Sequence, residues 1–462
     1  EQRRALAEPQ RVLPPLVTVP RVGVLPLSLA QQRLWLVERI SADSAAYNLP
    51  AALTVRGELD LQRLQRSFAQ LIERHEILRT SYHEDDDGNP LVRVAEHVDL
   101  PIRVLDISSL DSQARAQAQQ QWLLDCGAER IDLEQVPLLR VHLLRHGPQE
   151  HLILFAMHHI ISDGWSMAVL VQELITLYGG SPEPLPPLPV QYLDYAFWQQ
   201  RLLSDGWLAA DTDYWRETLS GAPSHLPLPL DYPRPAQASH DGDSVELRLE
   251  APLYEPIKAL AQQLGCTPYL LMLAAFQLML HRTCDTTDLV IGTDVAGRQQ
   301  QALEGLIGFF VNVLPMRSRL TPQQPFSEYV QTLNRNALAA FEHQELPLDL
   351  IIDACAVERI KGINPLIQVL FVMNNTPSAT LRVDDLVLEP LELKERHSKF
   401  EMGLFVEELG NSLVCNWSYA VALFRRERIE MMMRSWIGIL EQAVQDRHTL
   451  SGEFVMSVAP RS

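Results

Sequence analysis

The segment Leu152–Met157 is apolar at every position, and this feature most constrains the fold. A strand without a polar face has to lie inside a sheet that is covered on both sides. The chain then passes through His158–Ser166, and apolar residues recur at helical spacing from Met167 to Tyr178. A buried strand that leads through a polar turn into a helix predicts a layered α/β fold, with the polar turn at one end of a sheet.

The remainder of the chain predicts the same kinds of element in two halves of similar length. Ser28 and Gln31 form a capping-box pattern before a helix at 28–41, and Asp60 opens a second amphipathic helix. No sequence repeat relates the halves, so a pair of equivalent α/β lobes is a structural expectation. In the second half we expect helices at 252–264, 267–282, 325–341 and 425–445, and strands near 289–296, 311–317, 366–373, 383–390, 402–408 and 412–419.

Length and proline content predict how the chain is divided. A chain of 462 residues is long enough for two or three domains, and its 31 prolines gather in a few irregular stretches. Aromatic residues between 192 and 215 are predicted to pack between lobes rather than to form a ligand box. The predicted divisions are a linker at 1–26, an N-terminal lobe at 27–185, a bridging segment at 186–244, a C-terminal lobe at 245–450 and a C-terminal linker at 451–462.

Charge and cysteine content exclude several classes of function. Lys and Arg total 39 against 58 Asp and Glu, a net charge of −19 that disfavours nucleic acid as a partner. The five cysteines are widely separated, which predicts neither a disulfide framework nor a zinc site and favours a reducing compartment. No window offers about 18 uncharged apolar residues, so no membrane partner is expected. We expect a cytoplasmic protein, and a first residue other than Met suggests a part of a longer chain.

The segment His158–Ser166 contains the strongest candidates for chemistry. Its imidazoles titrate near neutral pH and could accept a proton from a nucleophile. Alternatively, the histidines are ordinary polar residues at a strand end and Asp163 caps the following helix. As a partner, Asp163 could orient an imidazole or bind an arginine elsewhere. A Gly-x-Ser-x-Gly elbow and a phosphate-binding loop are absent from the sequence, and adjacent histidines on an extended segment point to opposite faces, which disfavours metal binding.

The segment from His158 to Ser166 resembles the HHxxxDG signature of condensation domains from nonribosomal peptide synthetases. Six further segments resemble other motifs of that family in the same order, and the resemblance runs from about residue 12 to 445. A lone His-x-x-x-Asp pattern is weak, whereas seven ordered motifs are specific. The six segments are Leu27–Trp35, Arg74–Tyr82, Tyr192–Gln199, Ile291–Asn312, His343–Pro347 and Asn364–Phe371.

The resemblance implies an α/β (α+β) fold of two chloramphenicol acetyltransferase-like lobes, a V-shaped pseudodimer with a central tunnel. It implies an acyltransferase in secondary metabolite biosynthesis that forms a peptide bond. The amine of an aminoacyl thioester on a downstream carrier domain attacks an aminoacyl or peptidyl thioester on an upstream carrier domain. Both substrates arrive on phosphopantetheine arms, no cofactor is bound by the domain itself, and an adenylation domain is expected nearby.

The resemblance also implies roles for individual residues. His159 is expected to orient the attacking α-amine and to accept its proton, although an amine near neutral pH mainly needs positioning. Asp163 is expected to pair with Arg298 and hold the loop in shape. His158 is expected to be structural, and Gly164 to allow close approach of substrate or backbone.

Three further residues, Trp165, Ser166 and Asn312, are expected along the substrate tunnel by the same resemblance. Asp294 stands where the family commonly has proline. The opening and signature segments are most similar to domains that join an L-configured donor to an L acceptor. Two alternatives remain: an acyltransferase of the same superfamily that uses coenzyme A, and a condensation-like platform that recruits carriers without catalysis.

Overall fold

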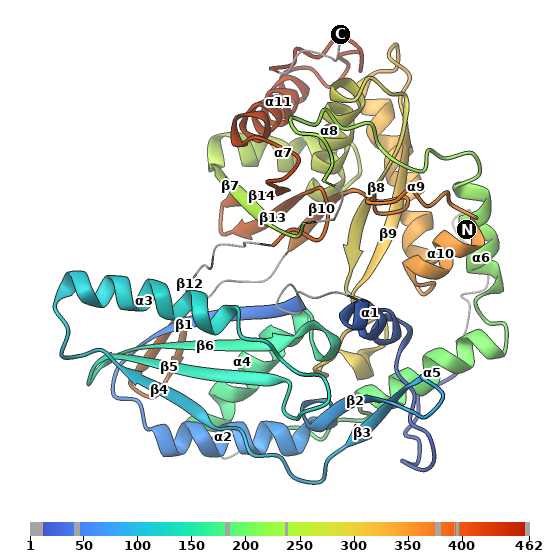
Figure 1. Ribbon diagram of the computed structural model, residues 1–462. Coiled ribbons are helices and arrows are strands. Elements are labelled where there is room, and N and C mark those ends of the chain that lie inside the picture. Colours follow the sequence, from blue (N-terminus) through green and yellow to red (C-terminus); the bar gives the residue numbers. More distant parts are fainter. Residues whose placement is uncertain are drawn as a thin grey trace, which may run out of the picture.

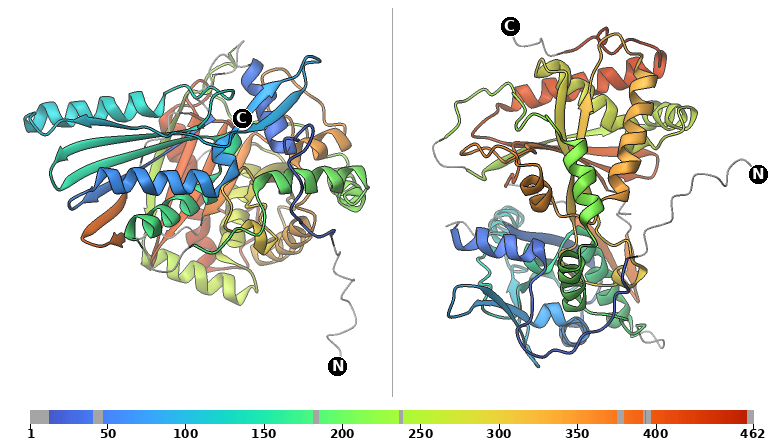
Figure 2. Two further views of the ribbon diagram at one scale, coloured as in Figure 1. Left: turned by 90° about the horizontal axis from the view of Figure 1, so that it is seen from below. Right: turned by 90° about the vertical axis from the view of Figure 1, so that its right-hand side faces the viewer.

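Two six-stranded sheets organise the molecule into two lobes that face one another (Figure 1). The computed structural model describes residues 13–40, 47–180, 185–235, 239–374, 380–391, 393 and 397–457. The predicted mixed α/β fold with two lobes is confirmed. The right-hand view of Figure 2 shows the N-terminal half below and the C-terminal half above, with helices of the middle of the chain beside the junction.

The N-terminal sheet is built around the apolar strand that the sequence predicts to be central. Eight of the nine residues of β6 are buried, and β6 pairs antiparallel with β1 on one side and β5 on the other. Helices α2 (Leu61–Arg74) and α4 (Gly164–Gly179) pack together on one face, and α3 (Ser112–Gly127) contacts the other. The strand order is β11 (Leu381–Val383), β12 (Leu386–Leu391), β1 (Asn48–Arg56), β6 (Glu150–His158), β5 (Leu139–Gly147) and β4 (Ile102–Asp106).

The C-terminal sheet has helices α7 (Ala251–Gln263), α8 (Pro268–Thr283), α9 (Phe326–Glu342) and α11 (Arg426–Gln445) packed around it. Helix α8 is apolar on all sides because it lies inside this layer, and 13 of its residues are buried. The strand order is β7 (Gly242–Leu249), β14 (Ser412–Ala420), β13 (Met402–Leu409), β10 (Val369–Asn374), β8 (Asp288–Val295) and β9 (Asn312–Arg319).

The bridging segment contains two helices, α5 (Tyr192–Ser204) and α6 (Ala209–Thr218), and α6 packs on α10 (Leu348–Ala354) of the second half. The ring centroids of Tyr192 and Tyr195 lie 4.9 and 4.8 Å from that of Phe310. The aromatic residues of this segment therefore join the lobes by packing, as predicted.

Several local sequence signals are confirmed. Ser28 and Gln31 form the predicted capping box at the start of α1 (Leu29–Ile40). Asp60 caps α2 through the backbone N–H of Arg63. The acidic run after Glu84 forms the turn between β2 (Thr80–Glu84) and β3 (Pro90–Val94).

The structure differs from the predicted domain divisions in three places. Strands β11 and β12 belong to the N-terminal sheet although they lie within 245–450, because β12 pairs with β1. Residues 13–26 are attached to the N-terminal lobe, where Arg21 binds Asp194 and Glu76. Residues 451–457 also pack on the protein, since Phe454 is buried against Phe326. The outer parts of the two predicted linkers, 1–12 and 458–462, lie outside the described residues, as do residues 181–184 near the end of the predicted N-terminal lobe.

Candidate active site

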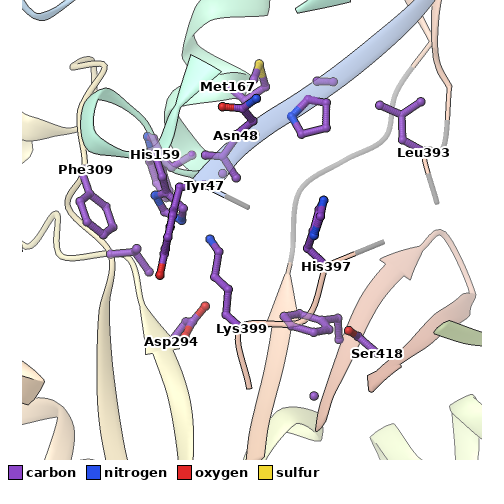
Figure 3. A pocket seen from close by; sticks show the side chains of 18 of the residues that line it. Tyr47, Asn48, His159, Met167, Asp294, Phe309, Leu393, His397, Lys399 and Ser418 are labelled. Atoms are coloured by element: carbon purple, nitrogen blue, oxygen red, sulfur yellow. The ribbon is translucent and has the colours of Figure 1, made fainter. Parts of the chain in front are cut away.

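A cavity of about 1710 Å³ lies between the two lobes. Its wall includes His159 and Gly164 from the N-terminal lobe, and Asp294, Phe309 and Lys399 from the C-terminal half (Figure 3). Most of the lining surface is apolar. Such a cavity, with a few polar groups converging on it, is the usual form of a substrate site.

His159 is the signature histidine whose side chain lies on the cavity wall. It follows the end of β6 and begins a single 3-10 turn, His159–Ile161. Its ring lies 4.5 Å from that of Phe309, and its Nδ1 has no hydrogen-bond partner within the described structure. Burial, and then the positive charge of Lys399, lower the pKa of His159 well below its usual value. The imidazole is therefore neutral near pH 7, and a neutral ring has one nitrogen that can accept a hydrogen bond.

His158 points away from the cavity and uses both ring nitrogens within the protein. Its Nδ1 accepts a hydrogen bond from the backbone N–H of Ile160 at 3.0 Å. The neutral ring therefore carries its proton on Nε2, which donates to Glu38 of α1 at 3.2 Å. This geometry fixes the path of the chain beneath His159, which is the structural position that the sequence predicts for His158.

Asp163 combines the two alternatives that the sequence leaves open, because it both caps a helix and binds an arginine. Its Oδ1 accepts from the backbone N–H of Ser166 at 2.9 Å, which caps α4. The same oxygen lies 3.2 Å from Nη2 of Arg298, so the predicted ion pair is present. Its Oδ2 accepts from the backbone N–H of Phe310 at 3.0 Å. Asp163 therefore anchors the segment beside His159 to the C-terminal half.

The prediction that Ser166 lies along the substrate tunnel is wrong, because this residue is buried and does not line the cavity. Its hydroxyl lies 2.8 Å from Arg298 Nη2 and 2.9 Å from the backbone nitrogen of Gly308. Arg298 also donates to the carbonyl oxygens of Leu303 and Leu306, both at 2.6 Å. These hydrogen bonds hold the Ser166 side chain in the network and away from the cavity.

Gly164, Trp165 and Asn312 do lie on the cavity wall. A Cβ added to Gly164 would meet no atom within 4 Å, so the glycine leaves open space toward the cavity. The Trp165 indole is 47% exposed and donates to the carbonyl oxygen of Glu304 at 2.9 Å. The Asn312 amide donates to the carbonyl oxygens of Gln344 and Leu346. These hydrogen bonds fix the segment that precedes α10.

Segments that are far apart in the sequence meet behind the site. Gln31 donates to the Tyr82 hydroxyl at 2.7 Å and to the carbonyl oxygen of Ile160 at 2.9 Å. The Tyr192 hydroxyl donates to the carbonyl oxygen of Phe309 at 2.7 Å. Three of the ordered motifs therefore contact the turn of His159, or contact or contain the aromatic residue that packs against it, and Tyr82 of a fourth motif contacts Gln31.

Sequence reasoning missed three residues of the site: Phe309, Asp294 as a polar group of the wall, and Lys399. Phe309 is inside a recognised motif, but only the fold shows that its ring contacts His159. Asp294 is visible as a departure from the family pattern, and its Oδ1 has no hydrogen-bond partner within the described structure. Burial raises the pKa of Asp294 to about 6. Lys399 lies outside every recognised motif, so no sequence signal marked it.

The described residues contain no group of three or more His, Cys, Asp or Glu side chains placed to hold a metal ion. Within the same residues, no single helix is long and apolar enough to cross a membrane, and only the bent pair α7 and α8 passes by length and composition.

Comparison with known proteins places these features in a family. The condensation domain family model matches residues 22–457. A linear gramicidin synthase protein of Brevibacillus parabrevis is 37% identical over 433 residues, which cover 92% of this chain and 8% of that protein. Bacitracin synthase 3 of Bacillus licheniformis is 35% identical over 415 residues, which cover 90% of this chain and 6% of that protein. The chain thus spans less than a tenth of the length of these two synthases.

Solved structures with the same fold include the X-domain from teicoplanin biosynthesis in complex with OxyB. It matches with a TM-score of 0.85 at 26% identity, covering 97% of this chain and 99% of that one. The first condensation domain of the calcium-dependent antibiotic synthetase matches with a TM-score of 0.78 at 18% identity, covering 95% and 100% of the two chains. Because the family model spans nearly the whole chain, the chain belongs to the condensation domain family.

Proposed function

We propose that this domain forms a peptide bond between two carrier-bound substrates in a nonribosomal peptide synthetase. The observation that carries the proposal is the separation of roles within the signature. His158 and Asp163 are fully used by protein partners, whereas the neutral ring of His159 lies on the wall of a large cavity between the lobes. The similarity to the gramicidin and bacitracin synthases over nine-tenths of the chain supports the same activity.

The chemistry needs an amine, a thioester and little else. An α-amine is partly unprotonated near neutral pH, so holding it at the thioester carbonyl provides much of the rate increase. The His159 imidazole accepts a hydrogen bond from the attacking amine and then its proton. The Asp163–Arg298 network acts indirectly, because it fixes the first turn of α4 against the C-terminal half.

The partners in this proposal are an upstream donor carrier, a downstream acceptor carrier and a neighbouring adenylation domain, all in the cytoplasm. The synthases that the chain resembles are more than ten times longer than it, which supports its place within a larger chain. Phosphopantetheine arms deliver both substrates, and no resident cofactor is required. The signature and opening motifs favour an L-configured donor and an L-configured acceptor.

One observation favours a second function, the recruitment of a partner protein. The X-domain, a structural relative at 26% identity, was solved in complex with OxyB. A recruiting domain needs its outer surface but not a neutral histidine beside an open cavity. The intact HHxxxDG signature and the position of His159 on the cavity wall therefore favour catalysis over recruitment alone.

The test is a transfer assay with two loaded carriers. The purified chain is mixed with a donor carrier bearing an L-aminoacyl group and an acceptor carrier bearing a second L-aminoacyl group, and intact-protein mass spectrometry follows both. We expect a dipeptidyl group on the acceptor and a free thiol on the donor. Parallel reactions use a D-aminoacyl donor, which we expect to be slower, and soluble acyl-coenzyme A. Transfer from acyl-coenzyme A without carriers, or no transfer from any donor, would refute the proposed function.

A further inference from the structure

Lys399 projects into the cavity from the C-terminal half, opposite the turn that contains His159. Figure 3 shows its side chain extending past Asp294 toward His159 and Tyr47. All four residues line the same cavity, and the Lys399 ammonium lies 5.5 Å from the centre of the Tyr47 ring. Lys399 is therefore a cation at the cavity wall that faces the proposed reaction centre.

The backbone around Lys399 is held at three points. The N–H of Ser398 donates to the carbonyl oxygen of His240 at 2.8 Å, and the side chain of Asn364 donates to the carbonyl oxygen of Lys399 at 3.0 Å. Two residues later, the N–H of Glu401 donates to the carbonyl oxygen of Gln368 at 2.9 Å. The ammonium thus extends from a fixed backbone, as expected for a preorganised electrostatic group.

The charge of Lys399 acts on both titratable groups beside it. It is the largest cause after burial of the lowered pKa of His159, and it opposes the raised pKa of Asp294. Within the described part of the cavity wall, the other Lys or Arg side chain is Arg33, which lies 3.3 Å from Asp349 in an ion pair. Of these two lining cations, Lys399 is the one whose charge contributes to the lowered pKa of His159.

We propose that the Lys399 ammonium contacts the thioester carbonyl oxygen during condensation and stabilises the negative charge that develops there. The amine lone pair forms the new C–N bond while the carbonyl π electrons move to the oxygen. The nitrogen then gives a proton to His159, the oxyanion re-forms the carbonyl, and the C–S bond breaks. The thiolate leaves with the proton from His159, so atoms and charges balance. This inference rests on the proposed peptide-forming function.

A lysine suits this position better than an arginine. Its ammonium is a compact charge on a flexible stem with three donors, whereas a guanidinium is planar and larger. The chain has four lysines among 39 Lys and Arg residues, so its cations are otherwise almost all arginine. A compact ammonium therefore approaches a single oxygen atom more closely than a guanidinium does.

The test compares Lys399→Met, Lys399→Arg and a matched control, Lys258→Met. Lys258 also lies over a tyrosine ring, at 4.6 Å from the centre of Tyr254, but is outside the cavity wall. The measurements are the single-turnover rate of dipeptidyl transfer with saturating loaded carriers, and the affinity for a donor carrier whose thioester is replaced by an amide. Melting temperatures confirm that each variant is folded.

We expect Lys399→Met to transfer about 10²-fold more slowly, within the range found for loss of one oxyanion donor. The affinity of Lys399→Met for the amide-linked donor should stay within twofold of the wild-type affinity. Lys399→Arg should recover part of the transfer rate, and Lys258→Met should transfer at the wild-type rate. A rate for Lys399→Met within twofold of the wild type would overturn the inference. So would equal rates for the Met and Arg variants, or a loss of affinity as large as the loss of rate. An inactive wild type would instead refute the proposed function itself.

Discussion

At the scale of single residues, the hydrogen-bond partners separate the groups that build the site from the group that reacts. His158 donates to Glu38 and accepts from a backbone N–H, so no ring nitrogen remains for substrate. Asp163 holds three partners in a buried position. His159 alone of the three presents its ring to the cavity. The signature is therefore one reactive side chain on a support made by its neighbours.

The sequence was most informative about this support when a motif connected distant residues. The contact between Asp163 and Arg298 was predicted across 135 positions from the resemblance, because both residues stand in recognised motifs. Lys399 could not be predicted in this way. A lone lysine carries no periodic signal, and its position depends on how the two lobes face one another.

Replacing Arg298 tests the support directly. Arg298→Met leaves the Asp163 carboxylate buried without its counter-ion, and we expect a loss of about 3–5 kcal/mol in the free energy of unfolding. The double variant Asp163→Asn/Arg298→Met should recover part of this loss, because no uncompensated charge remains. Urea denaturation measures both. A loss below about 1 kcal/mol in the single variant would show that the pair contributes little.

Asp294 provides a prediction with a defined pH dependence. A carboxyl whose pKa is about 6 when folded and 3.8 when unfolded binds more protons in the folded state between these values. The wild type therefore loses stability as pH rises through this interval. Asp294→Asn should be more stable than the wild type near pH 7, by about 3 kcal/mol, and nearly equal to it near pH 4. An advantage that did not grow with pH in urea denaturation would contradict the burial of this carboxyl.

At the scale of elements, strand order was the part of the fold that the sequence could not predict. The apolar run of β6 and the helical spacing of apolar residues in α2 correctly identified these two elements, because each pattern lies within the element's own residues. The predicted domain division assigned β12 to the C-terminal lobe, because an alternating pattern does not specify which of two sheets a strand joins; β12 lies between β11 and β1. Its partner is β1, more than 300 residues earlier, with Leu53 opposite Pro390.

The turn before Arg298 connects backbone geometry to the site. Gly297 has a φ of +65°, and an added Cβ would collide with the backbone of Phe310, the residue whose N–H binds Asp163. We expect Gly297→Ala to lose about 3 kcal/mol or more of unfolding free energy, from strain and overpacking together. Gly206→Ala is the matched control, since its φ is +74° but no atom lies within 4 Å of an added Cβ.

The control isolates the contribution of backbone strain. We expect Gly206→Ala to cost about 1 kcal/mol, because the left-handed conformation alone is penalised. Thermal or urea unfolding of the two variants gives the difference. Equal losses at the two glycines would mean that the close approach of Phe310 is not needed for stability.

At the scale of the whole molecule, one hydrophobic core runs through both lobes. The same cluster of buried residues includes Phe155 from the N-terminal sheet, Phe310 from the junction and Phe371 from the C-terminal sheet. Strand β12 additionally ties the second half to the first sheet. The two predicted lobes are thus joined by continuous packing and by strand pairing.

A shared core predicts that the lobes unfold together. Differential scanning calorimetry should show a single transition whose calorimetric and van't Hoff enthalpies agree. Lobes joined only by a flexible connector would unfold in two transitions. Two well-separated heat-absorption peaks would therefore contradict the coupling that the core and β12 provide.

The two lobes together form the cavity, and the neutral imidazole of His159 lies on its wall. The central claim is that this imidazole takes part in the proposed transfer. The most direct test of this claim is the single-turnover rate of dipeptidyl transfer, measured by rapid quench with both carriers loaded and saturating. We expect His159→Ala to be at least about 10²-fold slower than the wild type, as for loss of a positioned general base. His448→Ala, an exposed histidine, should be unchanged. Transfer by His159→Ala at the wild-type rate would contradict the account.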